Sequence, residues 1–375
     1  MIQKRSFCSD ELSLLGLGCM RFPLIPGTQE IDTEAAQAIV DRAYAAGVNY
    51  FDSAFGYHDG KSEGFIGAAL RKYPRESYRL VTKMPGWLLE KEGDPEAIFQ
   101  KQLQRTGADY FDYYLLHAVS GDNYQQYRDS GAIAYCEKML QEGKIRHFGF
   151  SFHGTPDALR EIIADRKWDF AQIQLNYMDW EKQDAKTQYA ILEQAGIPVV
   201  IMEPVRGGAL ADLSPEANAL LKAARPEASI ASWAIRFAAS LPGVMTVLSG
   251  MTTMQQLEDN LKTVTEFEPY TDGEYALINK ALEAFRSEVM IPCTGCRYCM
   301  DCPQGVEIPQ MFTLYNALAV DKRVSSFKER MGKVEPEKRA HNCIGCGVCA
   351  THCPQRIDIP ARMNDIAQLE IKHGI

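Results

Sequence analysis

Short apolar runs, rich in β-branched and aromatic residues, recur along the first 250 residues of the chain. Runs of this length that are bounded by glycine, proline or polar residues are typical of buried strands. We therefore expect strands at 14–18, 48–52, 78–83, 112–117, 145–151, 170–174, 198–203 and 244–248.

Between these runs, apolar residues recur at intervals of three and four, which is the pattern of amphipathic helices. The pattern is clearest at 33–46, 94–106, 155–164, 184–195 and 228–239. Asp32 or Thr33 suits the N-cap of the first helix, and Thr155 followed by Pro156 suits the start of the third. Eight strands that alternate with helices favour an α/β fold of the (β/α)8 TIM-barrel type, for which about 250 residues is typical.

The competing fold is a doubly wound open sheet. Such a sheet usually has fewer strands, and a dinucleotide-binding version carries the pattern GxGxxG after its first strand. The stretch from Gly16 and Gly18 to Arg21 lacks the third glycine. The barrel is therefore the favoured fold.

Polar residues stand at the carboxyl ends of three successive expected strands. These are Asp52, Lys83 and His117, and Tyr57 lies in the loop after Asp52. Singly, Asp52 could cap the next helix, Tyr57 could pack in a loop, Lys83 could be solvated, and His117 could be a hydrogen-bonded core histidine. In a (β/α)8 barrel, however, the carboxyl ends of the strands form the active-site face, so all four would face one cavity.

This group of side chains suits proton delivery to a carbonyl oxygen. A tyrosine hydroxyl, with an ordinary pKa of about 10, becomes a better acid when an ammonium group stabilises its phenolate. Lys83 can be that neighbour, Asp52 can keep Lys83 charged and oriented, and a histidine can hydrogen-bond the substrate oxygen. We expect Asp52, Tyr57, Lys83 and His117 to be catalytic.

The stretch Asp52-Ser-Ala-Phe-Gly-Tyr57, the dipeptide Thr82-Lys83 and the tripeptide Leu115-Leu-His117 resemble motifs of the aldo-keto reductase family. The resemblance runs from about residue 10 to residue 265. It implies an NAD(P)H-dependent oxidoreductase that passes hydride to an aldehyde or ketone, with Tyr57 as proton donor. A small-molecule carbonyl or alcohol would be its substrate.

The same resemblance implies a set of cofactor-binding residues, in which ordinary helix capping is an equal alternative for Thr253 and Asp259. The set is Ser151, Gln174, Met202, Gly250, Thr253, Gln256, Asp259 and Asn260. Gln256 stands where some members carry an arginine for a 2′-phosphate, so the choice between NADPH and NADH stays open. Met202 stands where an aromatic residue often stacks on the nicotinamide, and its thioether can pack there.

Charge and cysteine content restrict the partners and the cellular compartment that the sequence allows. The chain has 40 basic and 49 acidic residues, a formal charge of −9, which argues against nucleic acid or an anionic membrane as a partner. Because the sequence shows no secretory leader and no membrane-spanning run, we expect a cytoplasmic protein. In that reducing compartment, clustered cysteines indicate metal or cluster ligands rather than disulfides.

Eight of the eleven cysteines lie in two runs near the end of the chain. The first run holds Cys293, Cys296, Cys299 and Cys302, and the second holds Cys343, Cys346, Cys349 and Cys353. Matching positions differ by 50, 50, 50 and 51, and each run ends in Cys-Pro, so the tail contains an internal duplication. Cys8, Cys19 and Cys136 lie outside it, and we expect them to be packing residues.

The second run has ferredoxin spacing, in which three cysteines hold one [4Fe-4S] cluster and the cysteine before proline reaches the other cluster. Two crossed ligand sets follow: Cys293, Cys296, Cys299 and Cys353 for one cluster, and Cys343, Cys346, Cys349 and Cys302 for the second. The alternative is a pair of zinc sites, but zinc does not require the third cysteine or the Cys-Pro ending.

The whole arrangement resembles the branch of the aldo-keto reductases that carries a two-cluster ferredoxin-type tail. We expect a barrel at 1–290 and an α-helical ferredoxin-like domain at 291–375, with a helix at 308–320.

Three functions are compatible with the sequence. The first is a carbonyl reductase whose clusters serve electron transfer, with a possible electron-transfer protein partner, or structure. The second is an iron-sulfur electron-transfer protein whose barrel holds another redox group or substrate. The third, a non-catalytic nucleotide-binding or regulatory module, is disfavoured by the intact set of Asp52, Tyr57, Lys83 and His117.

Overall fold

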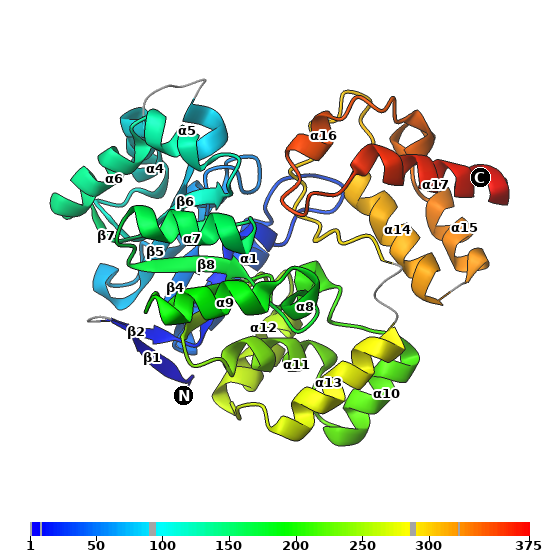
Figure 1. Ribbon diagram of the computed structural model, residues 1–375, viewed down its shortest axis with the longest axis horizontal. Coiled ribbons are helices and arrows are strands. Elements are labelled where there is room, and N and C mark those ends of the chain that lie inside the picture. Colours follow the sequence, from blue (N-terminus) through cyan, green and yellow to red (C-terminus); the bar gives the residue numbers. More distant parts are fainter. Residues whose placement is uncertain (1, 8–9, 90–94, 286–289, 322) are drawn as a thin grey trace. The chain divides into compact units, whose positions relative to one another are not determined.

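The computed structural model describes residues 2–7, 10–89, 95–285, 290–321 and 323–375 of the 375-residue chain (Figure 1). Cys8 lies outside the described residues, as does residue 94 at the expected start of the second helix.

Eight parallel strands close into one barrel, in which neighbouring strands pair in chain order and β10 pairs with β3. The strands are β3 Leu15–Gly18, β4 Tyr50–Asp52, β5 Arg79–Pro85, β6 Phe111–Val119, β7 Ile145–Phe152, β8 Phe170–Gln174, β9 Val199–Met202 and β10 Val244–Ser249. Every expected strand is present to within two residues at either end. The barrel prediction is confirmed, and the open-sheet alternative is wrong.

Helices alternate with these strands. They are α1 Thr33–Ala45, α2 Ser62–Leu70, α4 Pro95–Thr106, α6 Ala132–Gln141, α7 Pro156–Asp165, α9 Ala185–Gln194, α11 Ile230–Ala239 and α12 Met254–Thr265, with shorter helices α5 Tyr124–Asp129 and α8 Asp179–Lys182. Asp32 caps α1 by accepting a hydrogen bond from the backbone of Ala35 at 3.0 Å. Thr155 caps α7 in the same way, through Ala158. Both caps follow the sequence expectation.

A hairpin precedes the barrel and was not predicted. Strands β1 Lys4–Phe7 and β2 Asp10–Ser13 pair antiparallel. Phe7 packs in one buried cluster with Tyr50 and Tyr113, which lie near the starts of their strands. The hairpin therefore covers the amino-terminal end of the barrel and leaves the carboxyl-terminal end to the site.

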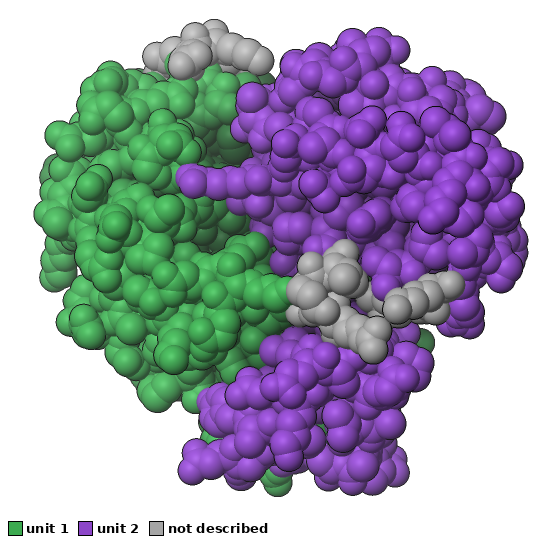
Figure 2. All heavy atoms as spheres, turned by 45° about the vertical axis from the view of Figure 1, so that its right-hand side comes forward, with its two compact units in different colours: residues 1–204, 232–270 green, residues 205–231, 271–375 purple. Residues whose placement is uncertain are grey.

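The chain divides into two compact units (Figure 2). The first comprises Met1–Pro204 and Ser232–Tyr270, and the second comprises Val205–Ala231 and Thr271–Ile375. The second unit thus combines the cysteine-rich tail with helices α10 Pro215–Ala224 and α13 Asp272–Phe285. An ion pair of 2.7 Å between Arg225 and Glu274 links the ends of these two helices. The expected boundary between residues 290 and 291 stays a prediction.

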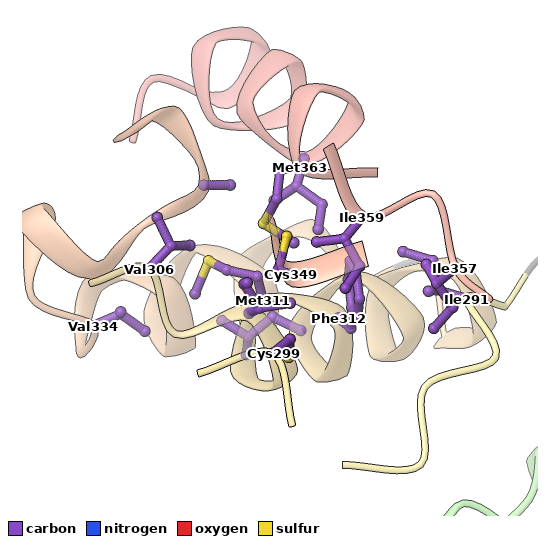
Figure 3. Close-up of a cluster of buried hydrophobic side chains, with 14 of the residues drawn as sticks. Ile291, Cys299, Val306, Met311, Phe312, Val334, Cys349, Ile357, Ile359 and Met363 are labelled. Atoms are coloured by element: carbon purple, nitrogen blue, oxygen red, sulfur yellow. The ribbon is translucent and has the colours of Figure 1, made fainter. Parts of the chain in front are cut away.

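The tail is helical, as expected. It contains α14 Ile308–Asp321, α15 Val324–Gly332, α16 Val348–Thr351 and α17 Ile359–His373. Figure 3 shows the core of this tail, where Met311 and Phe312 of α14 meet Ile359 and Met363 of α17, together with Cys299 and Cys349. Two cysteines of the duplicated runs are thus part of the hydrophobic core. Across the described part of the chain, no helix combines the length and the apolar character that a bilayer span requires.

Candidate active site and cysteine cavities

The four expected catalytic residues meet at the carboxyl-terminal end of the barrel. Asp52 is the last residue of β4, Lys83 lies in β5, His117 lies in β6, and Tyr57 lies in the loop after β4. All four side chains are buried, with exposed fractions of 9% or less. The strand order alone brings them together, because β4, β5 and β6 are neighbours in the barrel.

Lys83 is the centre of this group. Its Nζ donates to Asp52 Oδ1 at 2.7 Å, to the carbonyl oxygen of Ser53 at 2.7 Å and to Tyr57 Oη at 3.3 Å. A buried ammonium is tolerated only when it is paired and its donors are used, and here all three are. The charge is therefore fixed beside the hydroxyl of Tyr57.

The protonation of the flanking residues follows from burial. Burial raises the pKa of the Asp52 carboxyl, and the Lys83 ammonium opposes that shift. Burial lowers the pKa of His117 well below its ordinary value, and Lys83 and His153 lower it further. His117 is therefore a neutral imidazole at pH 7, able to donate one hydrogen bond.

Behind Lys83 lies a buried polar network that the sequence analysis missed. Side chains alternate along β5, so Lys83 faces the barrel interior while Thr82 faces the helices. Glu63 of α2 accepts hydrogen bonds from Thr82 Oγ1 at 2.6 Å and from Gln102 Nε2 at 2.7 Å. Gln102 also donates to the carbonyl oxygen of Lys83 at 3.0 Å.

The same network reaches the loop that carries Tyr57. Arg105 Nη1 donates to Glu63 Oε2 at 3.1 Å and to the carbonyl oxygen of Phe55 at 3.2 Å. The Lys83 strand and the Tyr57 loop are thus tied to one fully buried carboxylate. The clue in the sequence was polar residues, Glu63 and Gln102, on the core-facing side of two helices.

Trp87 is a second residue that the sequence analysis did not single out. It follows β5, and its ring lies 5.0 Å from the ring of His117, centre to centre. It is 44% exposed, an unusual position for so large an apolar ring. Its place beside His117 makes it a candidate for the wall of the substrate site.

Three expected cofactor-binding residues lie at the ends of β7, β8 and β9. Ser151 Oγ accepts a hydrogen bond from the backbone nitrogen of Ala118 at 2.7 Å. Gln174 Nε2 donates to Asp179 at 2.8 Å, and the sulfur of Met202 lies 3.5 Å from Gln172 Nε2. All three ends belong to the face of the barrel that carries Lys83.

The remaining expected cofactor residues follow β10. Gly250 lies in the loop, and Thr253 and Gln256 form a reciprocal capping box at the start of α12. Asn260 donates to Ser249 Oγ at 2.9 Å, and Asp259 accepts a hydrogen bond at its carbonyl oxygen from Thr263. The capping alternative is therefore realised for Thr253, while the exposed first turn of α12 remains open to a ligand.

The eight clustered cysteines line two separate cavities in crossed sets. Cys293, Cys296, Cys299 and Cys353 line one cavity. Cys302, Cys343, Cys346 and Cys349 line the other. Each set joins three cysteines of one run to the last cysteine of the other run, which is the arrangement expected from the spacing.

The thiols in each cavity also act on one another. Burial raises the pKa of the Cys299 thiol, and Cys296, Cys293 and Cys353 raise it further. Burial likewise raises the pKa of the Cys349 thiol, and Cys302, Cys343 and Cys346 raise it further. Groups of thiols whose negative forms repel one another need a positive centre among them to become thiolates together.

A single zinc ion and an iron-sulfur cluster place different geometric demands on four cysteines. A zinc ion binds sulfur at about 2.3 Å, so its four sulfurs lie about 4 Å apart. Among the described residues, no group of three or more His, Cys, Asp or Glu side chains is placed to hold a single metal ion. An iron-sulfur cube instead binds each of its cysteines through a different iron.

Two other cysteines are buried, in keeping with the packing role expected for them. Cys19 and Cys136 are fully buried. Burial raises the pKa of both thiols, that of Cys19 well above its ordinary value.

The (β/α)8 barrel is closed and carries a buried Asp–Tyr–Lys–His group at its carboxyl end, and the tail carries crossed cysteine cavities. Together these features define an oxidoreductase with an iron-sulfur tail. The chain belongs to the aldo/keto reductase family, whose model matches residues 14–283. A 4Fe-4S dicluster domain matches residues 292–358, a stretch that contains all eight clustered cysteines. The sequence resemblance to this family and to its ferredoxin-bearing branch is confirmed.

Known relatives cover the barrel. The chain is 26% identical over 317 residues to an NADH-specific methylglyoxal reductase of Escherichia coli, a match that covers 73% of this chain and 95% of the relative. It is 27% identical over 293 residues to an oxidoreductase of Bacillus subtilis, with 70% and 90% covered. Among solved structures, an aldo-keto reductase from Bacillus halodurans matches with a TM-score of 0.60 and 25% identity, covering 75% of this chain and 96% of that one.

Proposed function

We propose that this oxidoreductase reduces an aldehyde or ketone with NADPH or NADH, and that Tyr57 donates the proton. The observation that carries the proposal is the 3.3 Å contact between Lys83 Nζ and Tyr57 Oη in a buried site. When bound, the nicotinamide supplies a hydride to the carbonyl carbon. The side chains of this chain must then supply one proton to the carbonyl oxygen.

Tyr57 is the proposed source of that proton. As it leaves, negative charge develops on the Tyr57 oxygen, and the Lys83 ammonium stabilises that charge. Asp52 and the Ser53 carbonyl hold the ammonium in place, so no reorganisation is needed during the step. Neutral His117 would donate a hydrogen bond to the substrate oxygen and orient it.

The residues proposed to hold the nucleotide are those that line this face. Gln174 and Ser151 would contact the carboxamide end, and Met202 would pack against the nicotinamide ring. Gly250, Thr253, Gln256, Asp259 and Asn260 would hold the adenosine half. The exposed start of α12 supports phosphate binding there, because the dipole of the helix favours an anion at its amino-terminal end.

For the tail, we propose two [4Fe-4S] clusters, one in each cysteine cavity, that exchange single electrons with another protein. Anaerobically purified protein should contain about eight iron and eight sulfide per chain, which is two cubes, and little zinc. Stoichiometric zinc without sulfide would overturn the assignment. Bound flavin would instead favour an electron-transfer protein whose barrel holds another redox group.

The proton-donor role is tested by Tyr57→Phe. We expect kcat/KM for NADPH- or NADH-dependent reduction to fall by about 10²- to 10⁴-fold, because the acid is lost while the ring remains. Oxidation of the reduced nicotinamide is followed by absorbance, with a panel of aldehydes and ketones that starts with methylglyoxal, the substrate named for the Escherichia coli relative.

The matched control is Tyr124→Phe. Tyr124 is 9% exposed, as is Tyr57, but its hydroxyl donates to Asp165 instead of meeting Lys83. This control should keep the activity of the unmodified protein. Equal turnover in Tyr57→Phe and in Tyr124→Phe would refute the assignment of Tyr57.

A further inference from the structure

The duplication within the tail permits an internal comparison of the two cysteine loops. Thr294 in the first loop corresponds to Ile344 in the second, and Tyr298 corresponds to Val348, each at an offset of 50. Thr294 is 3% exposed, whereas Ile344 is 63% exposed and Val348 is 42% exposed. The polar Thr294 is thus buried, whereas its apolar counterpart Ile344 faces solvent, and Val348 faces solvent four residues later.

The first loop is covered by another segment of the same unit. A side chain at Gly207 would place its Cβ 2.1 Å from the carbonyl oxygen of Thr294, so the two backbones are in close contact. Gly207 has a φ of 64°, which a glycine adopts without strain. The segment around Gly207 therefore packs directly against the loop that carries Cys293 and Cys296.

The second loop has exposed apolar residues where the first is covered. Ile344 lines the second cysteine cavity together with Cys346, and Cys346 is itself exposed. Exposed apolar residues grouped at one place mark interaction sites on soluble proteins. Residues 343–351 include no Asp, Glu, Lys or Arg, so this surface offers apolar contact and no ionic contact within the loop.

We propose that the exposed face made by Ile344, Cys346 and Val348 docks a separate one-electron carrier protein through an uncharged contact. This inference rests on the proposed binding of a cluster in the second cavity. A cluster releases and accepts electrons singly, and the exposed Cys346 would bring its outer corner to the surface. A partner that covers Ile344 and Val348 would therefore place its own redox group beside that corner.

An uncharged docking face predicts how the rate of electron transfer depends on salt concentration. Association steered by charge slows steeply as ionic strength rises, whereas apolar association does not. We therefore expect the rate of electron transfer from the carrier to change less than about threefold between low and high salt, far below the 10- to 10³-fold effect of electrostatic steering.

The experiment uses the full-length protein loaded with iron and sulfide. Reduced flavodoxin and a reduced bacterial [4Fe-4S] ferredoxin serve as carrier probes, and cluster reduction is followed by stopped-flow absorbance. Binding of the same probes is measured by surface plasmon resonance. Ile344→Asp should slow reduction by both carriers at least tenfold and weaken binding to the same degree, while reduced methyl viologen, which needs no docking face, should react at an unchanged rate.

Two further variants separate docking from damage. Ile371→Asp places the same charge on α17, at a residue that is 71% exposed and lines neither cysteine cavity, and it should leave all rates unchanged. Ile344→Thr inserts the residue that the first loop carries, and it should retain the iron content while weakening carrier binding.

Several outcomes would overturn the proposal. One is that Ile344→Asp leaves the carrier rates unchanged, and another is that neither carrier reduces the wild-type protein. A third is that the wild-type protein is a dimer that Ile344→Asp converts to a monomer, because a second copy of the chain would then occupy the face. Since none of these measurements involves a carbonyl substrate, failure of the proposed reductase activity would appear separately.

Discussion

His117 and His153 are two of the buried histidines through which acid acts on the barrel. Burial lowers the pKa of both, that of His153 to about 4. In the unfolded chain a histidine has a pKa of about 6.5, so below that pH the unfolded state binds protons that the folded state refuses. The stability contributed by the neutral forms is present above pH 6.5 and is lost as the pH falls toward 4.

We therefore expect the free energy of unfolding of the barrel to fall by roughly 3 kcal/mol or less per histidine between pH 6.5 and 4. Urea unfolding followed by tryptophan fluorescence measures it, because Trp87, Trp168, Trp180 and Trp233 all lie in the first unit. His153→Asn should flatten the dependence. An identical pH dependence in that variant would show that His153 is not responsible.

For single residues, the sequence predicted the reactive side chains better than the side chains that hold them in place. Asp52, Lys83 and His117 could be found because they end apolar runs, where any polar residue is conspicuous. Glu63 and Gln102 lie within helices, where polar residues are ordinary, and their burial depends on how two helices pack against β5. The contact of Trp87 with His117 likewise depends on a loop whose path the sequence does not specify.

Among the elements, α2 depends on one glycine. A Cβ at Gly67 would lie 2.1 Å from the carbonyl oxygen of Thr106, at the end of α4. Gly64 lies in the same helix, but a Cβ there would meet nothing closer than 3.8 Å. The close approach of α2 and α4 matters because Glu63, Gln102 and Arg105 lie on them.

Gly67→Ala should therefore lower the free energy of unfolding by about 1–3 kcal/mol, because the added methyl forces the two helices apart. Gly64→Ala should be neutral or should raise it by up to about 1 kcal/mol, because alanine is the better helix former. Urea titrations of both variants make the comparison. Equal effects would mean that the contact at Gly67 relaxes without cost.

The strands and main helices were predictable because each has a strong period or a clear apolar run. The hairpin of β1 and β2 was not, since Lys4-Arg-Ser-Phe7 has one large apolar residue and no alternation of its own. It is held by contacts made only in the folded barrel, such as the 2.6 Å ion pair between Asp10 and Arg79. Short elements of this kind depend on their neighbours more than on their own sequence.

For the whole molecule, the crossed cysteine cavities can be tested by combining substitutions. If Cys353 serves the cluster of the first run, Cys353→Ser alone and Cys353→Ser with Cys299→Ser should each retain about half of the iron, because one of two cubes is lost. Cys353→Ser with Cys349→Ser should retain almost none.

An uncrossed arrangement predicts the reverse outcome for the two double variants. Iron and sulfide analysis after anaerobic purification distinguishes the two arrangements, and Cys136→Ser serves as the control because Cys136 is buried in the barrel. Cys-to-Ser changes keep the side-chain size, so the count of iron rather than loss of fold is the quantity compared.

The crossed cavities also bear on the architecture of the tail. One repeat alone carries three cysteines for one cavity and a fourth that belongs to another. Such a repeat could complete a cavity only by facing a second copy of itself. The tail therefore has the plan of two short chains that face each other and are joined end to end, and its two halves are unequal in what they expose.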